Sequence, residues 1–261
     1  MYQTITEELG EDKILRNKLI LKEIFKFQNV MIYILSLLVS SVSIRNGVFP
    51  FSIAILAACV GNSIPIVGVF VSCIIGICLT GNMNVLLEFI LISVIYFTLV
   101  LFFRNKVAVE ERNEEVKTGG KVFWAVLLVM YFKNFSEEAF MYRVFMSSVI
   151  GAITYVYYKV FVNGITVIEN IKDKKAFAVE ELIAMNVLIG VASLPLSQIN
   201  IFGLNLSNII IIFMIMLLGL KNGMMIGATS GVALSLAICM YDETTLLQVT
   251  IFAMSGILSG L

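Results

Sequence analysis

The sequence predicts an all-α membrane protein, a polytopic transmembrane helical bundle of about ten spans with the N-terminus and the C-terminus in the cytoplasm. Hydrophobic residues fill 59% of the 261 positions and charged residues only 14%, and the mean hydropathy is +0.98. Such a chain has too little polar surface to cover a soluble globule. The charged residues also form clusters that separate long apolar segments.

Ten apolar segments appear when the chain is divided at charges and at Asn, Pro and Gly clusters. A helix needs about 20 residues to cross a hydrocarbon core of roughly 30 Å. The expected spans are residues 30–44, 48–61, 64–79, 85–103, 122–132, 144–162, 181–196, 202–220, 223–240 and 245–261. Residues 48–79 carry no charge, but Pro65 suits a first helical turn. We therefore expect two short helices in that region.

The positive charges predict the orientation, because Lys and Arg concentrate in short cytoplasmic loops. With ten spans and a cytoplasmic N-terminus, the outside holds only Arg45, Lys133 and Arg143 of the 18 Lys and Arg residues. We expect a cytoplasmic segment at 1–28, a membrane domain at 29–261, and cytoplasmic loops at 104–121 and 163–180. The first loop is interpreted as a solvated linker that ends in the flexible pair Gly119 and Gly120.

The residue types argue against chemistry within this chain. Histidine, the commonest general base and transition-metal ligand, is absent. We find no phosphate-binding loop, nucleophile motif or metal-ligand spacing, and the zero net charge gives no reason to expect a nucleic-acid partner. Cys59, Cys73, Cys78 and Cys239 lie in apolar segments and are interpreted as buried. We predict no catalytic, cofactor-binding or metal-binding residue, and no enzyme activity.

Two acidic pairs lead into apolar segments: Glu137 and Glu138 within KNFSEEAFMYR, and Glu180 and Glu181 within KKAFAVEELIAMN. They are interpreted either as helix-start carboxylates that complement the positive helix end, or as coupling carboxylates of a transporter, since ionisable groups inside a membrane are usually functional. Glu88 is the one acid inside an apolar segment. We expect it near the outer interface, with its carboxylate reaching water.

Glycines spaced four residues apart mark the stretch LGLKNGMMIGATSGVALSL at 218–236. Small residues at this spacing let helices approach closely in lipid. We expect Gly219 to end one helix in a left-handed turn, Gly223 to begin the next, and Gly219→Ala to be milder than leucine substitutions deeper in the span. The candidate helix-packing or assembly residues are Gly227, Gly231, Ser235, Gly256 and Gly260. Their role is either packing between neighbouring spans or self-association.

The stretches GVFPFSIAILAA, FSEEAF, FAVEELIAMNVLIG, IGATSGVALSL and MSGILSGL occur in this order along the chain. In order, spacing and topology they resemble the ten-span N-terminal membrane region of stage II sporulation protein E from spore-forming Firmicutes. The resemblance covers essentially the whole chain and includes no catalytic motif. It implies that a longer relative continues into a metal-dependent PP2C-type serine/threonine phosphatase domain, which activates a forespore sigma factor at the polar septum.

The leading hypothesis is a non-catalytic domain that anchors, localises and helps assemble such a phosphatase in the cell membrane. The expected partners are the lipid bilayer, further copies of the chain and, by resemblance, cell-division proteins. The alternative is a multi-span small-solute transporter or permease subunit, which the acidic pairs support. Because the last apolar run reaches Leu261 without a polar tail, we also expect this chain to be a piece of a longer protein.

Overall fold

The computed structural model describes residues 25–42, 50–62, 64–102, 111–133, 140–171, 176–201, 203–241 and 246–261. Ten α-helices occupy most of these residues, one for each predicted apolar segment, which confirms the all-α class. They are α2 (Phe27–Ser40), α3 (Pro50–Val60), α4 (Ile66–Leu79), α5 (Met83–Phe102), α6 (Glu111–Lys133), α7 (Phe140–Glu169), α8 (Val179–Ser193), α9 (Leu206–Asn222), α10 (Met224–Tyr241) and α11 (Leu246–Ser259). The predicted division of residues 48–79 into two short helices, α3 and α4, is likewise confirmed.

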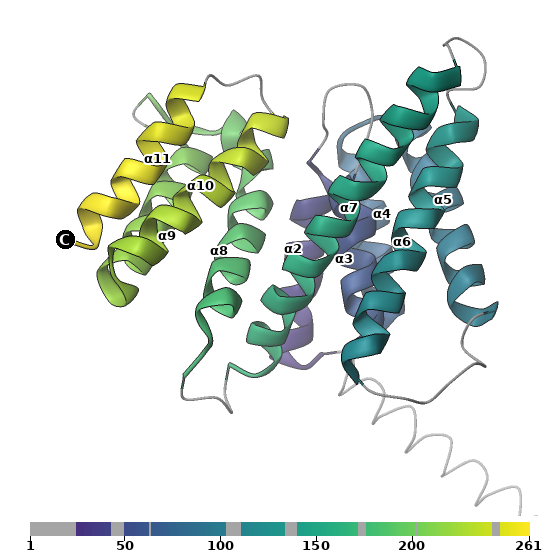
Figure 1. Ribbon diagram of the computed structural model, residues 1–261, viewed down its shortest axis with the longest axis horizontal. Helices are drawn as coiled ribbons and strands as arrows, with labels where there is room; N and C mark the ends of the chain where they lie inside the picture. Colours follow the sequence, from purple (N-terminus) through teal and green to yellow (C-terminus); the bar gives the residue numbers. More distant parts are fainter. Residues whose placement is uncertain are drawn as a thin grey trace, which may run out of the picture.

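Helix α8 lies between two groups of helices (Figure 1). On one side it packs against α7 and α2, which belong to the group α2 to α7, and on the other side against α9 and α10. Helices α9, α10 and α11 also pack against one another. The contacts of α8 therefore join the C-terminal three helices to the rest of the bundle.

Helix α3 forms the centre of the larger group. It packs against α2, α4, α6 and α7, and its side chains from Phe51 to Cys59 are almost completely buried. At about 1.5 Å per residue its 11 residues extend only about 16 Å. A helix of this length and burial is a core helix surrounded by protein, because half of a bilayer thickness is too short for a lipid-exposed crossing.

Helix length separates the ten predicted spans into classes. In the described ranges three helical segments are long and apolar enough to cross a membrane: α5, α7 and Val179–Gln198, where α8 continues into the 3₁₀ helix η2 (Leu194–Gln198). Six further apolar helices have 10–17 residues. By length and composition, three of the ten predicted spans could therefore cross a membrane.

Two expected loops are partly helical. Helix α6 begins at Glu111, so the second half of the predicted 104–121 linker continues the span that follows it. Gly119 lies inside this helix, where a Cβ would meet the rings of Tyr155 and Tyr158, so its role is close packing and not flexibility. Helix α7 extends into the predicted 163–180 loop as far as Glu169. Its buried apolar face continues there against α8.

The predicted start of the eighth span contains a small hairpin. Strands β1 (Asn200–Ile201) and β2 (Leu204–Asn205) pair in antiparallel fashion, and α9 begins directly after them. Gly203 between them has a φ of 80°, a conformation that glycine adopts without steric cost. Residues 202–205 were predicted to lie within the span because they are themselves partly apolar.

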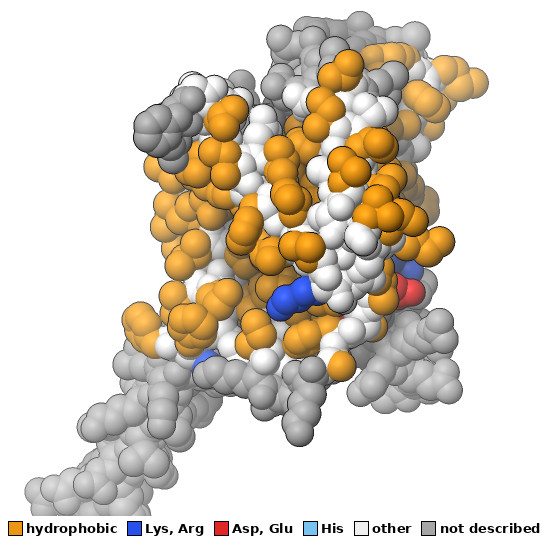
Figure 2. Space-filling model, turned by 90° about the vertical axis from the view of Figure 1, so that its left-hand side faces the viewer, with side chains coloured by type: hydrophobic (Ala, Val, Ile, Leu, Met, Phe, Trp, Pro, Cys, Tyr) orange, Lys and Arg blue, Asp and Glu red, His pale blue; other side chains and the backbone are white. Residues whose placement is uncertain are grey.

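The surface of the bundle is as apolar as the composition predicts. Hydrophobic side chains cover most of the face shown in Figure 2, and the few charged atoms visible there lie toward its lower part. Exposed large hydrophobic residues occur on all ten helices except the buried α3. Cys59 and Cys73 are buried as predicted and Cys239 is half-buried, whereas Cys78 is exposed, so the prediction for Cys78 was wrong. A contiguous apolar exterior of this kind is typical of a protein surrounded by lipid.

Many serine and threonine hydroxyl groups within these apolar helices have partners on their own helix. Ser93 donates to the carbonyl oxygen of Phe89 at 2.7 Å, and Ser40 donates to that of Ser36 at 2.7 Å. Because lipid offers no hydrogen-bond partner, such bonds to the preceding turn let serine and threonine occur in apolar helices at little cost.

Candidate functional site

The predicted glycine residues bring α10 and α11 into backbone contact. A Cβ placed on Gly227 would meet the carbonyl oxygen of Gly256, and one on Gly231 would meet that of Phe252. The reverse holds for Gly256, whose Cβ would meet the Gly227 carbonyl group, and a Cβ on Gly260 would lie 2.6 Å from the carbonyl carbon of Gly223. We call the contact formed by Gly227, Gly231, Gly256 and Gly260 the glycine seam. It joins two helices of the same chain.

Ser235, the fifth residue of the predicted set, is buried in the C-terminal half of α10. Its hydroxyl donates to the carbonyl oxygen of Val232 at 2.8 Å. Its hydrogen bond therefore lies within α10.

The turn between α9 and α10 differs from the prediction. Helix α9 continues through Asn222, and the residue with a positive φ is Gly223, at 90°. Gly219 was expected in this role but lies one turn earlier, inside the helix and buried. A Cβ on Gly219 would meet the Ser259 hydroxyl and lie 2.8 Å from the carbonyl oxygen of Gly256. The expectation that Gly219 ends the helix was therefore wrong, and Gly219 packs against α11 beside the glycine seam. That Gly219→Ala is milder than leucine at Gly227 or Gly231 stays a prediction.

The acidic pair Glu180 and Glu181 occupies the first turn of α8. The backbone N–H of Ala178 donates to Oε2 of Glu181 at 3.0 Å, which is half of a capping box because alanine supplies no acceptor in return. This geometry matches the helix-start interpretation. The other pair, Glu137 and Glu138, lies outside the described residues.

An ion pair that was not predicted from the sequence joins α5 to α6. The ammonium group of Lys133 lies 2.6 Å from Oε1 of Glu88, and the Glu88 side chain is only 15% exposed. Glu88 therefore has a protein partner, and its place near the outer interface stays a prediction. The signal was present in the sequence: consecutive antiparallel spans place the start of one and the end of the next on the same side, and each of these ends carries a single charge.

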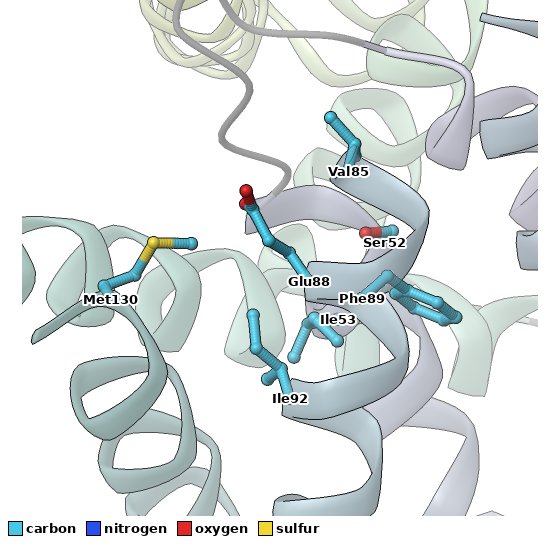
Figure 3. A pocket seen from close by; sticks show the side chains of 7 residues that line it. All are labelled: Ser52, Ile53, Val85, Glu88, Phe89, Ile92 and Met130. Carbon is cyan, nitrogen blue, oxygen red and sulfur yellow. The ribbon is translucent and has the colours of Figure 1, made fainter. Parts of the chain in front are cut away.

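Glu88 also lines a small cavity between three helices (Figure 3). Ser52 and Ile53 from the first turn of α3 lie on one side and Met130 of α6 on another. The remaining lining residues come from α5: Val85, Phe89 and Ile92. The cavity has a volume of ≈ 10 Å³, which corresponds to about one water position. It has no room for an organic solute.

The described part of the chain contains no cluster of three or more His, Cys, Asp or Glu side chains that could hold a metal ion. Glu88 of α5 is paired with Lys133, and Glu180 and Glu181 lie in the first turn of α8. What the described residues do show is close helix packing, a helix-start carboxylate and one ion pair between helices.

Comparison with known proteins decides the family. The family described as SpoIIE, N-terminal domain matches residues 3–261. The chain belongs to the SpoIIE N-terminal domain family. No curated protein and no solved structure matches the chain.

Family membership agrees with the resemblance to stage II sporulation protein E. This SpoIIE N-terminal domain is a membrane-associated part of a SpoIIE-like sporulation protein, and its apolar helices match that association. The glycine seam and the Glu88–Lys133 pair are accordingly interpreted as structural features of a membrane domain.

Proposed function

We propose that this domain anchors, localises and helps assemble a SpoIIE-like serine/threonine phosphatase of the PP2C type, and is itself non-catalytic. The enzyme activates a forespore sigma factor at the polar septum. The observation that carries the proposal is the family match over residues 3–261, on a chain whose described surface is apolar on nearly every helix. Further copies of the chain and cell-division proteins are the proposed partners.

The proposed topology has ten helices in alternating directions, with both termini on one side. Contacts between helix ends support this order. The side-chain Nε2 of Gln28, at the start of α2, donates to the carbonyl oxygen of Glu169, at the end of α7, with a distance of 2.5 Å. The Glu88–Lys133 pair joins the start of α5 to the end of α6. In a regular up-and-down order, each of these two pairs of ends lies on a common side of the membrane.

The second half of the chain follows the same order. The hydroxyls of Ser193, at the end of α8, and Ser207, at the start of α9, are 3.4 Å apart. At the other side, the contact of Gly260 with the backbone of Met224 brings the end of α11 to the start of α10. With the excess of Lys and Arg on the side of the N-terminus, these contacts favour a cytoplasmic start and a cytoplasmic end.

The short helices are compatible with this topology because the protein itself surrounds the shortest of them. Helix α3 has 11 residues and is shielded by its neighbours. The unpaired backbone groups at its two ends therefore do not need to reach the two lipid interfaces. Non-crossing or half-length helices at membrane depth are tolerated where protein buries them.

Transport of a small solute is the competing function, and the geometry gives it little support. The cavity beside Glu88 holds about one water position, and Lys133 neutralises the carboxylate. Glu181 accepts a backbone N–H at a helix start, a role in which a carboxylate stabilises its own helix.

The topology is tested by fusing either of two reporters after Leu261: a fluorescent protein that matures only in the cytoplasm, or alkaline phosphatase, which is active only outside it. We expect fluorescence and no phosphatase activity. The opposite pattern would refute the even number of crossings. A fusion inserted between α4 and α5, after Gly81, gives the matched control, because it should show the reverse signals.

The anchoring role is tested in sporulating cells with the domain fused to a fluorescent protein. We expect a band at the polar septum, unchanged by the substitutions Glu180→Gln and Glu181→Gln together. Uniform membrane fluorescence of the unsubstituted fusion would count against localisation by this domain. Solute uptake into proteoliposomes that is abolished by the two substitutions would favour transport instead.

A further inference from the structure

An amide group without a hydrogen-bond partner among the described residues is buried on α8. Asn186 on α8 is only 1% exposed, and neither its Oδ1 nor its Nδ2 has a partner among the described residues. Leaving both groups of an amide unpaired in an apolar interior is costly, and nearly all such buried groups in proteins have a protein or water partner. A buried amide of this kind favours a bound water molecule as its partner.

The position of Gly190 shows what faces Asn186. Gly190 follows Asn186 by one helical turn on the same face of α8, and a Cβ on Gly190 would meet the side chain of Leu234 on α10. The two helices run in the same direction, since α9 lies between them in the chain and reverses it (Figure 1). One turn before Leu234 lies Ser230, which is completely buried. The parallel course therefore brings Ser230 to the level of Asn186.

Ser230 has an acceptor to spare. Its hydroxyl donates to the carbonyl oxygen of Gly227 at 2.9 Å, and a serine oxygen that donates once still has two lone pairs. A single water molecule has the size and the paired donor and acceptor groups to connect an amide to a hydroxyl across a contact between two helices.

We propose that the contact between α8 and α10 contains a binding site for one ordered water molecule, held by the Asn186 amide and the Ser230 hydroxyl. The site lies where α8 packs against α10, in the contact that joins the C-terminal three helices to the rest of the bundle. The water links the two groups of helices through a polar contact inside an apolar interior. This role is independent of the phosphatase proposed above.

The direct test is nuclear magnetic resonance of the full chain in detergent micelles, with asparagine labelled by ¹⁵N. The side-chain amide protons of Asn186 are expected to show a cross-peak to a long-lived water molecule. Asn186→Leu identifies the signal by removing it. A structured chain with an assigned Asn186 amide and no such cross-peak would overturn the proposal.

A double-substitution cycle gives a second, independent readout. Asn186→Leu removes the amide at similar volume and is expected to lower the unfolding temperature by about 2–4 °C, the shift for losing about one hydrogen bond in a chain of this size. Ser230→Ala should lower it in the natural background and change it little once Asn186 is leucine. If Asn186→Leu raises the unfolding temperature instead, the amide has no ligand and the site does not exist.

The matched control is Ser235→Ala. Ser235 is buried in the same helix and also donates to the carbonyl three residues before it, at 2.8 Å, but it lies more than one turn beyond Ser230. Its effect is expected to be the same with asparagine or leucine at position 186. Coupling of equal size at Ser230 and Ser235 would contradict a localised site.

Discussion

The glycine seam predicts that one added methyl group between α10 and α11 destabilises the fold. We choose Gly227→Ala, because a Cβ there would lie 2.8 Å from the Cα of Gly219 and closer still to the carbonyl oxygen of Gly256. Both neighbours are backbone atoms, which cannot rotate away as a side chain can. The helices must therefore separate.

The magnitude follows from two opposing effects. Overpacking a tight contact costs about 1–3 kcal/mol, while replacing glycine by alanine inside a helix stabilises it by about 1 kcal/mol. Gly120 in α6 supplies the matched control, since a Cβ there meets no atom within 4 Å. Both substitutions gain the same helix stabilisation. The free energy of unfolding of Gly227→Ala should therefore be about 1–3 kcal/mol lower than that of Gly120→Ala.

The assay is unfolding of the purified chain by sodium dodecyl sulfate in mixed micelles, followed by circular dichroism. Gly227→Ala is expected to unfold at a lower detergent fraction than the natural chain, and Gly120→Ala at an equal or higher one. Equal midpoints for the two variants would show that α10 and α11 do not touch through Gly227. Oligomer size measured in the same detergent should be unaffected, because the contact lies within one chain.

Three further predictions follow from single contacts. Gly223→Ala should destabilise the chain by about 1–3 kcal/mol, because its φ of 90° and ψ of 170° suit glycine alone; detergent unfolding measures this, and an unchanged midpoint would contradict the turn geometry. Glu88→Lys should lower the free energy of unfolding by about 1 kcal/mol, and adding Lys133→Glu should restore it, because the ion pair then forms with its charges exchanged. A double variant as unstable as the single variant would exclude the pair. Gln28→Leu should lower the free energy of unfolding by about 1 kcal/mol, because it removes the hydrogen bond to the carbonyl oxygen of Glu169. Faster proteolysis near the C-terminal end of α7 would show this loss.

The glycine pattern shows how far sequence reasoning about a site extends. The spacing of Gly227 and Gly231 identified a helix face that allows close approach, because two residues without side chains one turn apart lie on the same face. Which helix fills the face depends on where α11 folds, a contact between residues that are 29 positions apart in the case of Gly227 and Gly256. For Gly219, local turn preference suggested a helix end, and the packing of α11 shows a helix interior instead.

The sequence by itself determined the all-α class, the number of helical segments and most of their boundaries, because apolar runs interrupted by charges, Pro65 and Gly223 are local signals. Only the tertiary structure decided that α3 is a buried core helix and that Glu88 has Lys133 as its partner. It also showed that no described residue pairs with the buried Asn186 amide. Burial and pairing depend on which distant segments meet, and every apolar segment of similar composition offers the same hydrophobic surface to several neighbours.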